Sequence, residues 1–443
     1  MKIKGKFLGS LSLMLTSTLG LWAQTAGVGT LDLTLEKAIE IALAENPTIR
    51  VADKDIELKK IADKEAWQAL LPTVDASLAL QNSIKVAAIK TQMGEFKMGM
   101  DGATTATGSL TATLPLFAPA VYQNMKLTKE DIMLAQEKSR ASKLDLIQQV
   151  TKAYYSALLA QDSYKVVLKA YDTSKKYFDL INNMYKVGRV SEYDKISAEV
   201  QMRSMNSTVV STESGVQLAM LQLKVLMGVT ENVDINIKDE LKKYENSLIL
   251  PAEGSDLSEN TALRQIDMSK TLLERARKII KTNFMPTIGM QGQFQYMSYS
   301  NPNWNIFGYK YSPAATIAFS VSIPIYHAST WTKLKSNRIQ LAQLDDTREN
   351  TQRQLAMAVE SYKKNMASSI AQVSSNAEAV KQAAKAVEIS SKRYDVGKGT
   401  VLELNQSETA QTQAELTYVQ SIYDYLKNKA DLDYTLGKET YMK

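Results

Sequence analysis

The stretch NPTIRVADKDIELKKIADKEAWQALLP runs from Asn46 to Pro72, and a second stretch of equal length, NTALRQIDMSKTLLERARKIIKTNFMP, runs from Asn260 to Pro286. Both begin with Asn, carry charged residues at helical spacing and end with Pro. We interpret the pair as an internal duplication, which decides the fold because each half must then repeat the same set of elements.

Further matches between the two halves share one register. Three pairs of anchors are each separated by 209 positions, which a chance match of short motifs would not produce. The one length change lies between Pro72 and Pro115, where we expect a loop, and loops vary in length more freely than packed helices. The matching anchors are Leu114-Pro115-Leu116-Phe117 with Ile323-Pro324-Ile325-Tyr326, Tyr185 to Gly188 with Tyr394 to Gly397, and Leu226-Met227-Gly228 with Thr435-Leu436-Gly437.

After the opening helix, each half shows two segments in which apolar and polar residues alternate. Such alternation indicates β-strands with one apolar face, as in a transmembrane barrel with lipid outside and water inside, although the edge of a soluble sandwich gives the same pattern. Four strands cannot close a barrel alone, so the barrel interpretation requires several chains. The apolar positions are Val74, Ala76, Leu78, Leu80, Leu110, Ala112, Leu114, Ile288, Met290, Phe294, Tyr296, Ile317, Phe319, Val321 and Ile323, and Tyr299, Trp304, Phe307, Tyr309 and Tyr311 could form an aromatic girdle.

Two long helices follow the strands, from about Ala118 to Tyr185 and from Ala328 to Tyr394. Apolar residues recur at alternating steps of three and four, a coiled-coil period, for example at Val359, Tyr362 and Met366. A helix of this length spans roughly 100 Å at about 1.5 Å per residue. The helices that return to Gly228 and Gly437 are shorter, and stacking the short opening helices on them end to end would make up the difference.

Each long helix ends in a turn that we expect at the distal tip of a helical hairpin. Gly188 and Gly397 follow the last helical residues and suit the C′ position, where a left-handed backbone is common. Ser191 and Thr400 are expected N-caps of the returning helices. The helical hairpins have equal length, so both tips can end in one plane.

The duplication predicts four segments. Residues 1–23 are expected to be a signal peptide, because Lys2, Lys4 and Lys6 precede an apolar stretch that is short for a membrane span of roughly 20 residues; a retained signal anchor is the alternative. We expect a first repeat over 24–228, an inter-repeat link or equatorial collar over 229–257, and a second repeat over 258–443. The absence of Cys favours a periplasmic or outer-membrane protein over a small secreted scaffold.

Composition argues against catalysis. His327 is the only His and there is no Cys, so we expect no metal site, no cofactor and no enzyme, with His327 in a structural or surface role. The net charge of +6 comes from charges of both signs alternating along the helices, which does not indicate nucleic-acid binding. Asp345 and Asp346 lie among compensating charges, and Asp162 and Glu213 are predicted to be solvated.

The order and duplication of these motifs resemble the TolC-like outer-membrane efflux family. The resemblance rests on Leu33-Thr34-Leu35-Glu36-Lys37-Ala38, Asn46-Pro47, Leu71-Pro72, the Pro-containing strand ends and the Tyr-x-Val-Gly turns, and it covers nearly all of the mature chain. It implies a mainly α fold with a small β part. Long helical hairpins would form an α-barrel in the periplasm, and four strands per subunit would contribute to a trimeric 12-stranded transmembrane β-barrel in the outer membrane.

The resemblance also implies a function and partners. We expect a homotrimeric channel subunit of a multicomponent (tripartite) efflux system, which passively conducts drugs or other substrates from an inner-membrane pump and a periplasmic adaptor to the outside. The alternatives are the outlet of a type I protein secretion system and, from another class, a non-conducting periplasmic coiled-coil protein. The cargo, the pump, and the open or closed state of the tip are not specified by the sequence.

Site residues follow from the resemblance by their positions at the two turns. Asp194 and Glu403 fall where family members place acidic pore residues, and Tyr394 falls on a tip-closing tyrosine. Gly399 stands where some members carry a latch arginine, and Gln406 where some carry a second aspartate. The pore or gate candidates are Tyr185, Asp194, Tyr394, Glu403 and Gln406, and the adaptor-contact candidates are Val187, Gly188, Arg189, Ser191, Val396, Gly397, Lys398 and Thr400.

Overall fold

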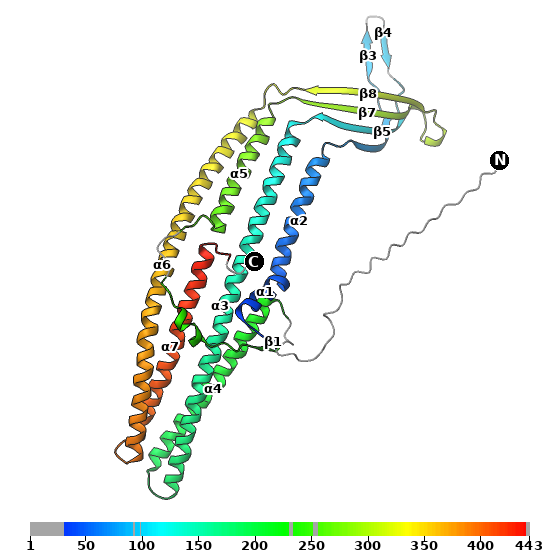
Figure 1. Cartoon of the computed structure of the whole chain (residues 1–443). Helices are drawn as coiled ribbons and strands as arrows, with labels where there is room; N and C mark the ends of the chain where they lie inside the picture. Colours follow the sequence, from blue (N-terminus) through cyan, green and yellow to red (C-terminus); the bar gives the residue numbers. More distant parts are fainter. Residues whose placement is uncertain (1–30, 92–93, 98, 230–233, 251–255, 440–443) are drawn as a thin grey trace, which may run out of the picture.

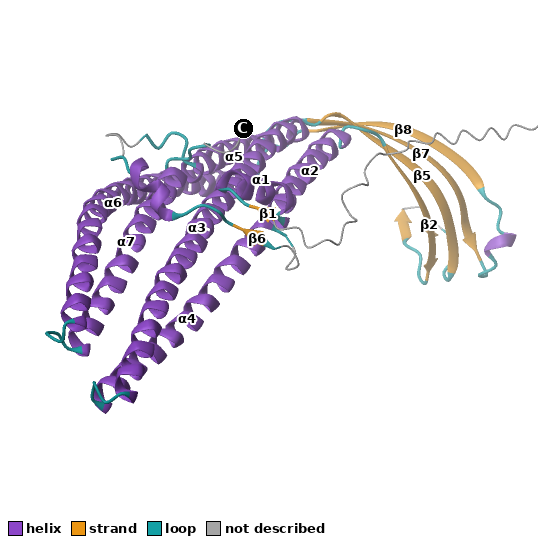
Figure 2. Ribbon diagram, turned by 60° about the horizontal axis from the view of Figure 1, so that its bottom comes forward, coloured by secondary structure: helices purple, strands orange, loops and turns teal. Residues whose placement is uncertain are grey.

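The computed structural model describes residues 31–91, 94–97, 99–229, 234–250 and 256–439, so the expected signal peptide over 1–23 lies outside the described residues. The molecule is long, with a layer of helices that carries a curved sheet at one end (Figures 1 and 2). Within the described residues, no helix combines the length and the hydropathy that a membrane-spanning helix requires.

Helices and strands alternate in the order that the duplication predicts. The first half contains β1 (Leu31–Asp32), α1 (Leu35–Glu45), α2 (Pro47–Gln68), β2 (Thr73–Ser83), β3 (Ala88–Thr91), β4 (Gly94–Lys97), β5 (Ala103–Phe117), α3 (Pro119–Lys186) and α4 (Glu192–Met227). The link and second half contain β6 (Ile235–Asn236), the 3₁₀ helix η1 (Leu241–Ser247), α5 (Thr261–Thr282), β7 (Thr287–Asn301), the 3₁₀ helix η2 (Ile306–Gly308), β8 (Ser312–Ser322), α6 (Ala328–Asp395) and α7 (Val401–Thr435).

The two longest helices have the same length. Both α3 and α6 contain 68 residues, which corresponds to roughly 100 Å. In the half of the layer nearest the tips, α3 packs against α4 and α7, while in the half nearest the sheet it packs against α2 and α5 (Figure 1). The predicted heptad positions are those that become buried, including Val359 and Met366 in α6 and Val150 and Leu158 in α3.

Each short helix continues a returning helix through one asparagine. Asn46 caps α2 by accepting the amide of Thr48 at 2.8 Å, and its Nδ2 donates to the carbonyl of Leu226 near the end of α4, also at 2.8 Å. Asn260 caps α5 and donates to the carbonyl of Thr435 at the end of α7 at 2.7 Å. The stacking that the helix lengths predict is therefore made by the same contact in both halves.

The sheet is antiparallel in the order β2-β5-β7-β8, and its two faces differ in polarity. Directly opposite residues share a face, and one row across the four strands consists of Ala76, Leu110, Phe294 and Ala315. The adjacent row, on the other face, consists of Asp75, Thr111, Gln293 and Thr316. The predicted alternation is confirmed, and its apolar side chains are exposed in the single chain, with Leu78 at 93% and Phe319 at 70%.

The long connection between β2 and β5 contains a feature that the sequence did not predict. Strands β3 and β4 form a separate antiparallel hairpin, which projects beyond the four-stranded sheet (Figure 1). It lies in the interval where the two halves differ in length. The extra residues are thus accommodated outside the sheet, and the register of the paired strands is preserved.

The main core lies where α1 and the link wrap around α3 and α7. Strand β1 pairs in parallel with β6, and Tyr154 of α3 donates its hydroxyl to Asp239 of the link at 3.2 Å. The prediction that Asp162 is solvated was wrong: it is 8% exposed and accepts the amide of Leu241 at 2.8 Å. Burial raises the pKa of Asp162, although Leu241 and the nearby Lys165 both favour its charged form.

Candidate functional site at the helical tips

Both tips are built by the same C-terminal turn. The amide of Gly188 donates to the carbonyl of Tyr185 at 2.9 Å, and the amide of Arg189 donates to that of Met184 at 2.9 Å. In the second tip, Gly397 and Lys398 make the corresponding bonds at 2.9 and 2.8 Å. This paired arrangement requires a left-handed residue, and Gly188 and Gly397 have φ values of +73° and +71°.

The first tip starts its returning helix with a closed capping box. The hydroxyl of Ser191 accepts the amide of Asp194 at 3.1 Å, while the carboxylate of Asp194 accepts the amide and the hydroxyl of Ser191 at 3.2 and 2.7 Å. Lys195 lies over the ring of Tyr185, 5.1 Å from its centroid. Asp194 is therefore hydrogen-bonded within its own turn, where the helix N-terminus favours its negative charge.

The second tip replaces this box with an ion pair. Thr400 accepts the amide of Glu403 at 3.2 Å, but the carboxylate of Glu403 lies 3.6 Å from the guanidinium of Arg393, which also donates to the carbonyl of Lys398 at 3.3 Å. At 3.6 Å the Arg393–Glu403 contact is too long for a hydrogen bond. Arg393 thus bridges the end of α6 and the start of α7 across the turn.

A small apolar cluster joins the two tips. Ile181 of α3, Ala198 of α4 and Val401 of α7 are buried together, and Tyr394 of α6 packs against them with Phe178 and Val190. The hydroxyl of Tyr394 has no hydrogen-bond partner among the described residues. Its pKa is raised by burial and by the negative charge of Asp194 in the other tip. We call Ile181, Ala198, Val401 and these three partly buried residues the tip cluster.

Gln406 lies in a different environment from Glu403. It is exposed and lines an open groove between α4 and α7 together with Tyr193, Ile196, Val200 and Leu402. The turn residues themselves are also exposed, with Val187 at 69% and Val396 at 68%. The adaptor-contact candidates therefore form accessible ends in the single chain.

The structure brings Asp194 and Tyr394 together but keeps the two acidic candidates in separate turns. Arg189 and Lys398, the cations nearest in sequence, make no ion pair in the described part of the chain. Arg393 provides that contact instead and was missed by the sequence analysis. Its signal is positional, since a cation in the last turn of α6 is close to the helix C-terminus and to any acid in the next N-terminal turn.

A second missed residue lies farther from the tip. Glu408 of α7 is only 9% exposed, and its Oε1 has no hydrogen-bond partner in the described part of the chain. Burial raises the pKa of Glu408 to about 7. Its four-residue spacing from Leu404 in the buried stripe of α7 could have revealed it. No group of three or more His, Asp or Glu side chains among the described residues is placed to hold a metal ion.

Comparisons with known proteins agree with this geometry. The model of the family described as "Outer membrane efflux protein" matches residues 38–229 and 255–438. The chain is 22% identical to the outer membrane protein TolC of Salmonella enteritidis over 417 residues, which cover 91% of this chain and 82% of that protein. It is 21% identical to the alkaline protease secretion protein AprF of Pseudomonas aeruginosa, over 90% of this chain and 83% of that protein. The crystal structure of the Campylobacter jejuni CmeC outer membrane channel matches with a TM-score of 0.73 at 15% identity and covers 98% of this chain and 94% of that one.

Proposed function

The chain belongs to the outer membrane efflux protein family, and from this premise we propose that it is the outer-membrane channel subunit of a tripartite efflux system. Family membership also places it in the outer membrane, as a channel protein and not an enzyme. In the proposed role it passively conducts drugs or other exported substrates that an inner-membrane pump and a periplasmic adaptor deliver to the tips.

The observation that carries the proposal is the two-faced sheet with open edges. In the described part of the chain, no strand pairs with the outer edge of β2 or of β8. An unpaired edge cannot remain in lipid, and neither can the polar face of the sheet. Three copies that join β8 of one chain to β2 of the next would close twelve strands, with the row of Leu110 outside and the row of Thr111 inside.

The same three copies would bring the tips together around one axis. Asp194, Glu403 and Tyr394 would each be presented three times, and we propose that they line or close the periplasmic mouth together with Tyr185 and Gln406. We propose the exposed turns at Val187–Ser191 and Val396–Thr400 as the contacts for the adaptor. The division into two repeats over 24–228 and 258–443 with a link over 229–257 is kept as part of this proposal.

A second function is favoured by one comparison. The match to AprF, named as an alkaline protease secretion protein, has nearly the same identity and coverage as the match to TolC. A type I protein secretion outlet would use the same duct with a different inner-membrane partner. A non-conducting periplasmic coiled-coil protein is disfavoured, since it would have no use for a sheet with an exposed apolar face.

Paired substitutions on the two faces of β5 test the proposal. An arginine on the lipid face near the middle of a membrane costs about 2–4 kcal/mol, while one on the water-filled side is tolerated. We therefore expect Leu110→Arg to reduce the amount of trimer extracted from outer membranes by detergent, and Thr111→Arg to leave it unchanged. Native mass measurement gives the oligomeric state, and planar bilayer recordings give the conductance.

Two outcomes would overturn the proposed function. One is a wild-type protein recovered as a monomer from the soluble periplasmic fraction. The other is a trimer in detergent that produces no current in bilayers. Export of small dyes against export of a protease by cells carrying the channel would then decide between the efflux and the secretion roles.

A further inference from the structure

The seam between α3 and α7 is apolar at both ends and polar in the middle. Val401 and Leu404 are buried toward the tip, and Val419 and Ile422 are buried toward the main core. Between them the same stripe of α7, at steps of three and four residues, carries polar side chains. These are Glu408, Gln411, Thr412 and Glu415.

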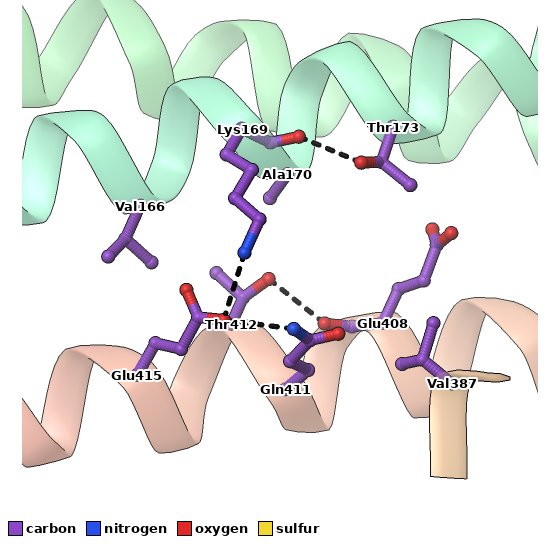
Figure 3. Close-up of a pocket in the computed structure, with 9 residues that line it drawn as sticks. All are labelled: Val166, Lys169, Ala170, Thr173, Val387, Glu408, Gln411, Thr412 and Glu415. Atoms are coloured by element: carbon purple, nitrogen blue, oxygen red, sulfur yellow. Dashed lines mark hydrogen bonds and ion pairs between the residues drawn. The ribbon is translucent and has the colours of Figure 1, made fainter. Parts of the chain in front are cut away.

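A pocket occurs at this polar section. It has a volume of about 330 Å³ and is lined across from α7 by Val166 and Ala170 of α3 and Val387 of α6 (Figure 3). Figure 3 shows the side chain of Glu408 extending toward α3, away from the other acid of the pocket. Space for several water molecules therefore lies between the main core and the tip cluster, where close packing would otherwise hold α7 against α3.

The cations near Glu408 are engaged with other acids. From α3, Lys169 approaches Glu415 at 3.4 Å, and Gln411 also donates to Glu415, at 2.9 Å. From α6, Val387 faces the pocket, and the next residue, Glu388, is exposed and paired with Lys385 and Lys392. Glu408 is thus a nine-tenths buried acid that faces no unpaired cation from α3, α6 or its own helix.

We propose that Glu408 is a proton-linked hinge residue, at which the seam between α3 and α7 closes on proton uptake and loosens on ionisation. The neutral acid fits the apolar walls of Val166, Ala170 and Val387, whereas the charged form requires water and draws the helices apart. The tips lie beyond this section of the seam, so its loosening separates them. As a device of the gate the hinge rests on the proposed function, but the movement belongs to a single chain.

The direction of the pH effect follows from the two environments of the carboxyl group. In the closed seam, burial places the pKa of Glu408 at about 7, while in an open seam it returns toward the ordinary value of 4.5. The closed state binds the proton more tightly, so the ratio of closed to open seams rises as pH falls from about 7 to about 4.5 and is constant outside this window. The full change is about two orders of magnitude in that ratio.

Because the sequence contains no Cys, a pair of labels can be introduced without background. Val187→Cys and Val396→Cys place one nitroxide on each exposed tip, and mixing labelled with excess unlabelled chain isolates the distance within one chain. Pulsed electron paramagnetic resonance in detergent at pH 4.5 and pH 8 then measures the separation. We expect a short, narrow distance distribution at pH 4.5 and a longer, broader one at pH 8.

Three variants make the assignment specific. Glu408→Gln should give the short distance at both pH values, while Glu213→Gln, which changes an exposed acid of α4, should keep the wild-type response. Glu415→Gln frees Lys169 to pair with Glu408 and should move the midpoint to lower pH. If Glu408→Gln fails to fold, this midpoint shift carries the test.

A wild-type distance that does not change with pH, or a change that persists unaltered in Glu408→Gln, would overturn the hinge. Bilayer conductance provides a separate readout. A protein that shows the pH-dependent distance but carries no current would contradict the proposed channel and leave the hinge standing. A conducting trimer with fixed tips would contradict only the hinge.

Discussion

The waist of the molecule and its tips are held by different amounts of packing. At the waist, which we define as the section where α1, β1, β6 and η1 surround α3 and α7, a continuous cluster buries Ile39, Tyr154, Leu158, Leu223 and Ile422 almost completely. The tip cluster contains three buried residues, and the remaining contacts there are caps and exposed charges. The difference indicates that the waist fixes the helices, while the tips can change position at small cost.

Polar contacts show the same contrast. At the waist the link is tied to both hairpins, since Asp162 of α3 accepts the amide of Leu241 at 2.8 Å and Tyr425 of α7 donates to the carbonyl of Ile249 at 2.8 Å. At the tips, Ser191 with Asp194 and Arg393 with Glu403 bond mainly within their own turns. The first set joins elements distant in sequence, so it resists separation of the hairpins, whereas the second set moves with its turn.

The largest effect is expected from a cavity at the waist. Leu158 is fully buried, and Leu158→Ala should lower the free energy of unfolding by about 2–5 kcal/mol because it removes packed methyl groups and leaves a void. Val187→Ala at the first tip changes a side chain that is 69% exposed and should stay within about 0.5 kcal/mol of wild type. Thermal unfolding followed by circular dichroism measures both, and equal shifts in the melting temperature would remove the distinction between waist and tips.

A smaller effect is expected at the joints that stack the short helices on the returning ones. Asp is as good an N-cap as Asn, but Asn260→Asp replaces the Nδ2 donor, 2.7 Å from the carbonyl of Thr435, with a buried acceptor. We expect a loss of about 1–3 kcal/mol, the cost of leaving a buried polar group unsatisfied. The same melting experiment on Thr34→Asp, at the exposed N-cap of α1, should show almost no change. A stable Asn260→Asp protein would mean that the joint is only a cap.

Periodicity and duplication predicted most of the fold for a physical reason. The steps of three and four in α3 and α6 determine which face is buried, and the alternation around Leu110 and Thr111 determines the two faces of the sheet. The turns at Gly188 and Gly397 were predictable because few other residues adopt a left-handed backbone. These features depend on residues near one another in sequence.

The parts that the sequence did not reveal depend on distant residues. Asp162 is buried because Leu241, 79 positions away, reaches it from the link, and no local pattern contains that information. Glu408 is enclosed by α3 and α6, so its burial depends on how the two hairpins meet. At the tips, the position of Glu403 was predicted from the resemblance, but its partner Arg393 was identified only when the backbone of the second turn was known.

The smallest effect on stability is expected at Arg393, where the effect on the gate should be clearest. Its ion pair with Glu403 is about half exposed, with 54% and 45% of the two side chains accessible, and such pairs contribute about 0.2–1 kcal/mol. Arg393→Gln should therefore leave the melting temperature unchanged but raise the ratio of open to closed second tips by up to about fivefold, since 1 kcal/mol corresponds to that factor.

Single-channel recording of Arg393→Gln gives the open fraction directly. Arg189→Gln is the matched control, because Arg189 occupies the first tip, is exposed, and makes no ion pair in the described part of the chain. A larger current in Arg393→Gln alone would assign the moving contact to the second tip, where the acid is held by a side chain and not by its own cap. Equal currents in the two variants would mean that the difference between Asp194 and Glu403 has no part in opening, and that the tips move together from the seam above them.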